Sequence, residues 1–74
     1  MMMIQIPKFK FSIGNAITEK DPNSRIEYLI YDISYSVATG DWYYRYSYWE
    51  GGYEHFCKSP IKYVEALFDK GGES

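Results

Sequence analysis

The feature that most constrains the fold is residues 41–57, DWYYRYSYWEGGYEHFC, where aromatic side chains recur at nearly every second position around a double glycine. Alternation with a period of two indicates β-strands, because successive side chains on a strand point to opposite faces of the sheet. Gly51 and Gly52 can adopt the positive φ angles that a two-residue hairpin turn needs. The stretch therefore predicts a β-hairpin with strands at residues 42–49 and 53–57, at the centre of the sheet.

Two further strands are predicted before this hairpin. Residues 8–18 alternate apolar and polar side chains from Phe9 to Ile13, which is typical of a half-buried strand. Residues 26–37 are apolar on both faces in their first half and on one face in their second, as in the bent strands of small barrels. The short connection at residues 38–41 makes the last three strands an antiparallel meander. In the longest strand the alternation predicts one shared face for Leu29, Tyr31, Ile33, Tyr35 and Val37.

The last regular element is predicted to be a helix at residues 60–69. Ser59 is a good N-cap residue and Pro60 is favoured in the first helical turn. Apolar side chains follow at helical spacing, at Ile61, Val64, Leu67 and Phe68. A helix of about ten residues is not stable alone in water, so this stripe is expected to pack on the sheet. Residues 70–74 are expected to be frayed.

Together these elements predict a single domain over residues 1–74 of mainly β (α+β) class. We expect a strongly curved four-stranded antiparallel meander or a small barrel, with one C-terminal α-helix packed on it. A chain of 74 residues is close to the smallest size that folds alone, and its one cysteine excludes an internal disulfide. Aromatic residues make up 20% of the chain and supply the large buried areas that so short a chain needs.

Three stretches resemble SH3-like small β-barrel proteins of the kind common in phage and prophage genomes. Residues 11–17, FSIGNAI, resemble their opening strand, residues 42–52, WYYRYSYWEGG, their central strand and turn, and residues 59–67, SPIKYVEAL, their closing turn. The expected helix is longer than the single 3₁₀ turn that is usual there. The resemblance implies a binding module, because SH3-like barrels rarely catalyse reactions, and it names no ligand.

Charge and hydropathy limit the classes of partner. The formal net charge is −2, whereas nucleic-acid binding usually depends on a clustered basic patch. No apolar run is long enough to span a membrane, and the first residues lack the pattern of a secretory signal. A free cysteine suits a reducing compartment, so we expect a cytoplasmic protein without membrane contact.

The chemistry-bearing residues of the predicted sheet are few. His55 and Cys57 lie two apart on one strand, either as half of a metal site or activated thiol, or as a packed cysteine beside a surface histidine. The chain has no other Cys or His, so the second alternative is favoured, and we expect no metal and no cofactor. The carboxylates Asp32, Asp41, Glu50 and Glu54 are expected to face solvent. A domain this small seldom has room for a pocket of about 300 Å³ or more, so acid–base chemistry by these carboxylates is disfavoured. The chain also offers no plausible catalytic triad, metal set or cofactor-binding loop, so we expect no enzyme.

The candidate binding site is the strand at residues 42–49, because its two faces cannot both be core in so small a domain. One face carries Tyr43, Arg45 and Trp49. The other carries Trp42, Tyr44, Tyr46 and Tyr48. Whichever face is displayed presents the residue types enriched at protein-binding hot spots. The plainer alternative is that the rings cover the core while their hydroxyls reach water.

These observations predict a small non-catalytic protein-interaction module that binds a host or phage protein through its aromatic strand. Two alternatives stay open. One is single-stranded nucleic-acid binding by aromatic stacking, which the scattered Lys and Arg residues disfavour and which steep salt dependence would identify. The other is a self-associating structural protein, because a short fourth strand would leave an edge free to pair.

Overall fold

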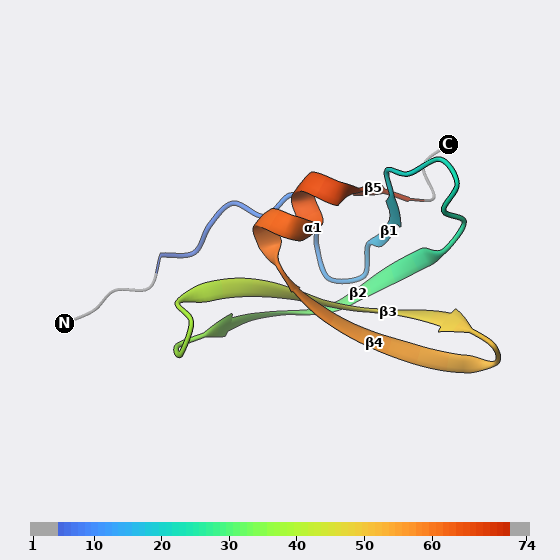
Figure 1. Ribbon diagram of the computed structural model, residues 1–74. Helices are drawn as coiled ribbons and strands as arrows, with labels where there is room; N and C mark the ends of the chain where they lie inside the picture. The colour runs from blue at the N-terminus through green and yellow to red at the C-terminus, as the bar shows by residue number, and fades with distance from the viewer. Residues whose placement is uncertain (1–4, 72–74) are drawn as a thin grey trace.

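The computed structural model describes residues 5–71, and its strands form one antiparallel sheet (Figure 1). In chain order the elements are β1 (Ala16–Glu19), β2 (Glu27–Ser36), β3 (Asp41–Glu50), β4 (Tyr53–Pro60), α1 (Ile61–Leu67) and β5 (Phe68–Lys70). The order across the sheet is β4-β3-β2-β1-β5, so the first and last strands lie side by side. The prediction of a mainly β chain with an antiparallel meander and one helix is confirmed, with five strands instead of four.

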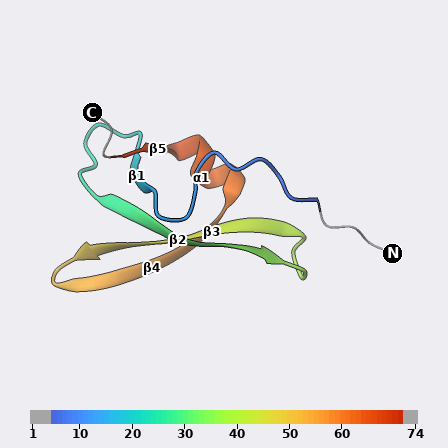
Figure 2. The ribbon, with the colours of Figure 1, turned by 180° about the vertical axis from the view of Figure 1, so that it is seen from behind.

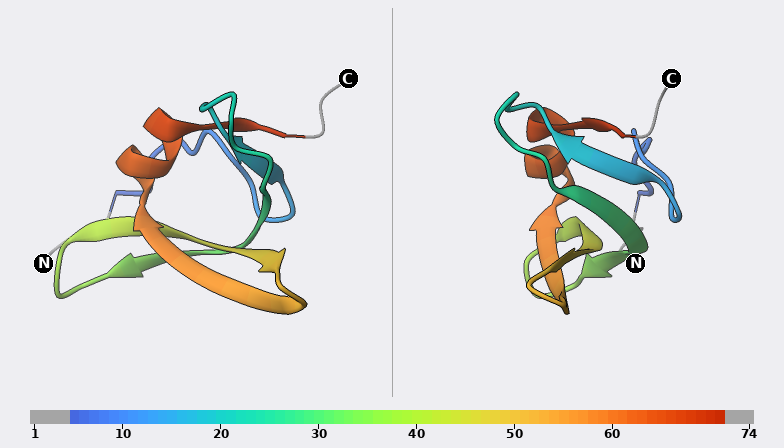
Figure 3. Two further views of the ribbon diagram at one scale, coloured as in Figure 1. Left: turned by 45° about the vertical axis from the view of Figure 1, so that its right-hand side comes forward. Right: turned by 90° about the vertical axis from the view of Figure 1, so that its right-hand side faces the viewer.

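The sheet bends strongly along β2. The two opposite views in Figures 1 and 2 place β1, β5 and α1 on one side and the twisted β2–β3–β4 ribbon on the other. Figure 3 shows β2 running from the ribbon towards β1. The space between the two halves is filled by the buried side chains of Phe11, Ile17, Ile30, Tyr44, Tyr46, Val64 and Phe68. We call the face of the sheet towards this core the inner face, and the opposite face the outer face.

A β-bulge at Tyr31 decides which side chains of β2 reach the core. The register against β3 shifts between Ile30 and Asp32, so Tyr31 is an extra residue on β2. One extra residue reverses the alternation of faces. Ile30 before the bulge and Ile33 after it therefore both pack in the core, while Leu29 lies on the outer face. The prediction that Leu29, Tyr31 and Ile33 share one face is wrong for this reason.

The first strand is shorter than the predicted residues 8–18, because a turn interrupts it. The amide of Asn15 donates to the carbonyl oxygen of Ser12 (3.0 Å), and the Asn15 side chain accepts a hydrogen bond from the Ser12 amide (3.0 Å). The amide of Phe11 is bound by the Tyr44 hydroxyl (3.1 Å) and not by a neighbouring strand. Phe11 is thus buried from a loop, and β1 begins only at Ala16.

The predicted fourth strand at residues 53–57 continues to Pro60, and this shortens the predicted helix. Ser59 is the last-but-one residue of β4, and its hydroxyl bonds the Tyr46 hydroxyl (2.8 Å). It therefore does not cap α1, which follows Pro60 without a side-chain cap. The prediction that Ser59 is the N-cap of the helix is wrong because Ser59 is part of strand β4.

The predicted helix at residues 60–69 also ends earlier, because its last residues form a strand. Phe68 has an extended backbone (φ −123°, ψ 152°) and starts β5, which pairs with β1. The pairing continues to Gly71, whose amide donates to the carbonyl oxygen of Ala16 (2.7 Å). Lys70 and Gly71 are therefore ordered by β1, and the rest of the predicted frayed end, residues 72–74, lies outside the described residues.

Candidate functional site

The inner face of β3 belongs to the core. Tyr44 and Tyr46 are buried, while Trp42 and Tyr48 on the same face are half-buried. The residue 5–15 loop and α1 cover this face, and the ring of Trp42 packs edge-on against Phe9 (5.5 Å between centroids). The alternative in which Trp42, Tyr44, Tyr46 and Tyr48 are displayed to a partner is therefore wrong for Tyr44 and Tyr46. The hydroxyls of Tyr44 and Tyr46 both form hydrogen bonds with other side chains of the protein.

The hydroxyl of Tyr44 joins three segments of the chain. It donates to Oε2 of Glu65 on α1 (2.8 Å) and accepts a hydrogen bond from the amide of Phe11 (3.1 Å). The same Glu65 oxygen accepts the amide of Lys10 (2.9 Å). Buried polar groups need such partners, and a satisfied network fixes the relative positions of the elements it joins. The network holds the N-terminal loop on α1 and β3.

This network predicts a loss of stability in alkaline solution. Burial raises the pKa of Tyr44 from 10.0 to about 12, the Glu65 carboxylate raises it further and the backbone hydrogen bond to Phe11 opposes the rise. Burial also raises the pKa of Tyr28 and of Tyr46. A folded-state pKa above the unfolded value gives stability that is complete below pH 10 and is lost as the pH rises from 10 to 12. Denaturant unfolding across this range should show a falling free energy of unfolding.

The control for the alkaline prediction is Tyr44→Phe. This variant lacks the titrating hydroxyl, so its free energy of unfolding should fall less steeply between pH 10 and 12, with the remaining slope due to Tyr28 and Tyr46. Identical slopes for the two proteins would contradict the burial of the Tyr44 hydroxyl.

The outer face of β2, β3 and β4 carries a contiguous group of exposed apolar side chains. We call it the outer-face cluster; its members and exposed fractions are Leu29 (49%), Tyr31 (40%), Trp49 (68%) and Phe56 (65%). Ser47 of β3 lies opposite both Leu29 and Phe56, so these side chains form one row across three strands. The rings of Tyr31 and Phe56 meet edge to face, with centroids 5.8 Å apart. The protein thus displays a surface built from three strands rather than from one.

A shallow groove of about 240 Å³ adjoins the cluster. Its lining is Ala16, Glu27, Tyr28, Leu29, Ser47, Tyr48, Trp49 and Glu54. Ser47 is buried although it is on the outer face, and its hydroxyl donates to Oε2 of Glu54 (2.9 Å). The groove therefore combines the Trp49 indole with the carboxylates of Glu27 and Glu54. An aromatic face beside carboxylates attracts a cationic side chain.

The predicted outer set of Tyr43, Arg45 and Trp49 does lie on one face, but only Trp49 is exposed. Arg45 donates from Nε to the Ser34 hydroxyl (3.4 Å), and Lys58 lies over the Tyr43 ring (5.0 Å from Nζ to the centroid). Tyr43 and Arg45 are half-buried at the border of the outer-face cluster.

Sequence reasoning missed three members of the cluster. The alternation predicts that Leu29 and Tyr31 share a face with Ile33, because the bulge leaves no mark in the pattern of β2. Phe56 was overlooked although its position was readable. It alternates with His55 and Cys57 on β4, which places it on the face opposite to theirs.

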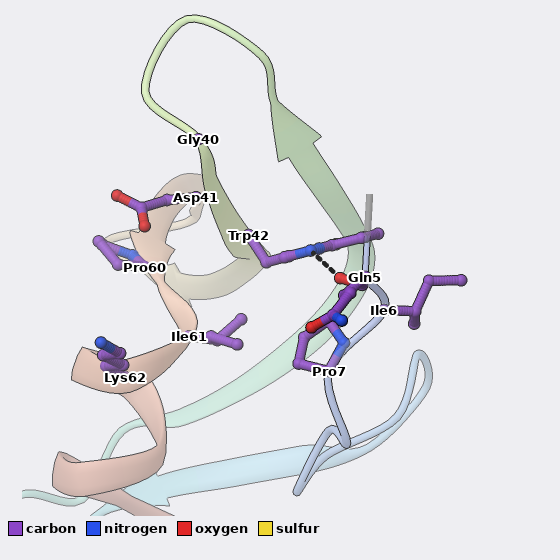
Figure 4. Close-up of a pocket in the computed structure, with 9 residues that line it drawn as sticks. All are labelled: Gln5, Ile6, Pro7, Gly40, Asp41, Trp42, Pro60, Ile61 and Lys62. Atoms are coloured by element: carbon purple, nitrogen blue, oxygen red, sulfur yellow. Dashed lines mark hydrogen bonds between the residues drawn. The ribbon is translucent and has the colours of Figure 1, made fainter. Parts of the chain in front are cut away.

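A second cavity, of about 430 Å³, lies where the N-terminal segment crosses the end of β3 (Figure 4). Its lining is Gln5, Ile6, Pro7, Gly40, Asp41, Trp42, Pro60, Ile61 and Lys62. The indole nitrogen of Trp42 donates to the Gln5 carbonyl oxygen (3.3 Å), while Asp41 and Lys62 lie at the opposite side. The expectation that so small a domain has no pocket above about 300 Å³ is wrong. The cavity arises between a chain segment and the sheet end, so it needs no hollow core.

His55 and Cys57 lie on the inner side of β4 without forming a reactive pair. His55 stacks on Tyr48 (centroids 4.9 Å apart, rings 17° from parallel), and its Nε2 lies 3.1 Å from the Glu50 carbonyl oxygen. Cys57 packs against the core, and burial raises the pKa of its thiol, which disfavours the reactive thiolate. Within residues 5–71, no three His, Cys, Asp or Glu side chains gather in a way that could hold a metal ion.

Comparison of the chain with protein-family models, with curated proteins and with solved structures finds no match. In the part of the chain that the structure describes, no helix is long and apolar enough to cross a membrane.

Proposed function

We propose that the protein is a small non-catalytic protein-interaction module that binds its partner through the outer-face cluster. The observation that carries this proposal is the exposure of Trp49 and Phe56 beside Leu29 and Tyr31 on one face. Aromatic residues dominate binding hot spots, and contiguous exposed apolar patches mark interaction sites. The cluster combines both features on a rigid three-stranded support.

The groove beside Trp49 favours a partner with a basic anchor residue. A Lys or Arg side chain placed there would lie over the indole and close to the carboxylates of Glu27 and Glu54. The same carboxylates would repel the phosphates of a nucleic acid, whose binding grooves are positively charged. We therefore favour a basic protein segment over single-stranded nucleic acid.

We also infer that the fold is SH3-like. Support comes from the strand order β4-β3-β2-β1-β5 and from the position of α1 between β4 and β5. This relationship agrees with a binding role but identifies no ligand. A phage or prophage origin and a cytoplasmic location stay predictions.

Selection from a random displayed-peptide library tests the proposed function. Peptides bound by the wild type should be enriched in Lys and Arg, and Trp49→Ala should weaken the best of them by at least about tenfold. Val37→Ala is the matched control, because Val37 is exposed in the turn between β2 and β3, outside the cluster. Both variants should keep the stability of the wild type.

Two results would contradict the proposal. One is a set of selected peptides whose affinity is unchanged by Trp49→Ala. The other is tight binding of a fluorescent oligothymidine with a steep salt dependence, which would support nucleic acid instead.

A further inference from the structure

β4 lies at a free edge of the described sheet. Within residues 5–71 it pairs only with β3, and it runs for eight residues, longer than the sequence predicted. Edge strands present a row of unpaired amides and carbonyls that can pair with another chain.

The turn before β4 determines which backbone groups point outwards. Gly51 (φ 64°) and Gly52 (φ 83°) form a two-residue turn between the paired residues Glu50 and Tyr53. The pair that flanks such a turn is hydrogen-bonded, and hydrogen-bonded and non-hydrogen-bonded pairs alternate along the ladder. The amides and carbonyls that point away from β3 are therefore those of Glu54, Phe56 and Lys58.

The outer face of this edge is complementary to itself. Glu54, Phe56 and Lys58 are exposed and lie on the same face of β4. When a second β4 runs antiparallel with Phe56 opposite Phe56, each Glu54 faces Lys58 of the other copy. Opposite charges and aromatic pairs directly across two strands are stabilising. In the same register the outward-pointing amides and carbonyls of Glu54, Phe56 and Lys58 in one copy lie opposite those of the other copy and can form hydrogen bonds with them.

Registers shifted by two residues form less favourable pairs between the two copies. A shift of two residues in one direction sets Phe56 opposite Glu54 and leaves Lys58 facing the turn glycine Gly52. A shift in the other direction sets Phe56 opposite Lys58 and Glu54 opposite Pro60, which has no amide to donate. A lysine on an edge strand usually hinders pairing. In the symmetric register Lys58 instead meets its counter-charge.

We propose that a second copy of this chain pairs along β4, antiparallel, with Phe56 opposite Phe56, so that one sheet continues through both copies. The pairing uses the backbone edge of β4 and shares only Phe56 and Glu54 with the outer-face cluster and its groove, whereas Trp49 and Leu29 lie outside it. It brings the two outer-face clusters next to each other across the symmetry axis.

Charge reversal tests the pairing in the full chain. Sedimentation velocity over a range of concentrations should show a dimer for the wild type. Glu54→Lys and Lys58→Glu each set like charges opposite one another at two symmetric places, and each should weaken the dimer by about tenfold or more. The double variant E54K/K58E restores the opposite charges and should restore the dimer. Lys20→Glu, an equal charge change in an exposed loop, should leave it unchanged.

The register has its own test. In the proposed pairing His55 lies opposite Cys57 of the second copy, in a non-hydrogen-bonded pair with Cα atoms about 4.5 Å apart, within the range of a disulfide. His55→Cys should therefore give a disulfide-linked dimer under mild oxidation. The wild type and the double variant H55C/C57S should not.

Several outcomes would overturn the pairing. These are a wild type that stays monomeric at millimolar concentration, a dimer that survives both single charge reversals, or the absence of the cross-link. A monomer whose β4 binds an extended strand of a different protein would also overturn it. Trp49→Ala separates the two proposals, because it should weaken peptide binding at the outer face by at least about tenfold and leave the dimer intact.

Discussion

Tyr44→Ala is expected to lower the free energy of unfolding by about 3–5 kcal/mol. The Tyr44 side chain is fully buried, and its ring packs against Phe11 (5.8 Å between centroids) and Phe9 (6.1 Å). Truncation leaves a cavity and removes the hydrogen-bond partner of the Phe11 amide and of Glu65. The total free energy of unfolding of a small domain is only about 5–15 kcal/mol, so this substitution is expected to remove a large part of it. Urea unfolding followed by circular dichroism measures the loss.

The neighbouring Tyr43→Ala is the matched control. Tyr43 lies on the outer face, half-buried, where its ring meets Lys58 and its hydroxyl bonds Thr39 (3.0 Å). We expect a loss of about 1 kcal/mol, the usual size for a partly exposed position. Large and equal losses from both substitutions would contradict the assignment of one face of β3 to the core.

Phe68→Ala should cost about 3–5 kcal/mol, which is large for a residue next to the C-terminal end of the described chain. Phe68 is buried, and its ring meets Tyr28 (5.3 Å) and Tyr46 (5.7 Å) edge to face. It also begins β5, opposite Glu19 of β1. Thermal and urea unfolding should both show the loss. Asp69→Ala changes an exposed neighbour on the same strand and should have little effect. Similar, mild effects of the two substitutions would mean that β5 is not part of the core.

The β3–β4 hairpin could be predicted because two independent signals agree there. Aromatic alternation fixes the strand period, and the double glycine supplies the turn, with positive φ at both residues. The Tyr31 bulge could not be predicted, because an extra residue is recognised only by its pairing with β3. Because the alternation does not reveal the bulge, it places Leu29 and Tyr31 on the same face as Ile33, whereas they lie on the opposite face.

Strand β5 could not be predicted from the sequence, for a different reason. Leu67 and Phe68 continue the apolar spacing of α1, and a strand of three residues is too short to show a period of its own. What sets the extended backbone of Phe68 is the unpaired side of β1, more than forty-five residues earlier in the sequence. Trp49 belongs to one of the two faces that the sequence left open for display, and it is exposed in the structure. The positions of Leu29 and Tyr31 depend on strand register, which a single sequence does not contain, whereas the alternation along β4 was enough to place Phe56.

The pairing of β1 with β5 delays completion of the sheet until residue 70 has been synthesised. Ile17 lies opposite Lys70, so β1 gains its second neighbour only after the chain has left the ribosome as far as β5. Contacts between residues so far apart in sequence are costly in loop entropy and slow folding. Until Phe68 emerges, the nascent chain exposes the apolar face of the β2–β3–β4 ribbon. A nascent chain that has not yet reached Phe68 should therefore bind ribosome-associated chaperones.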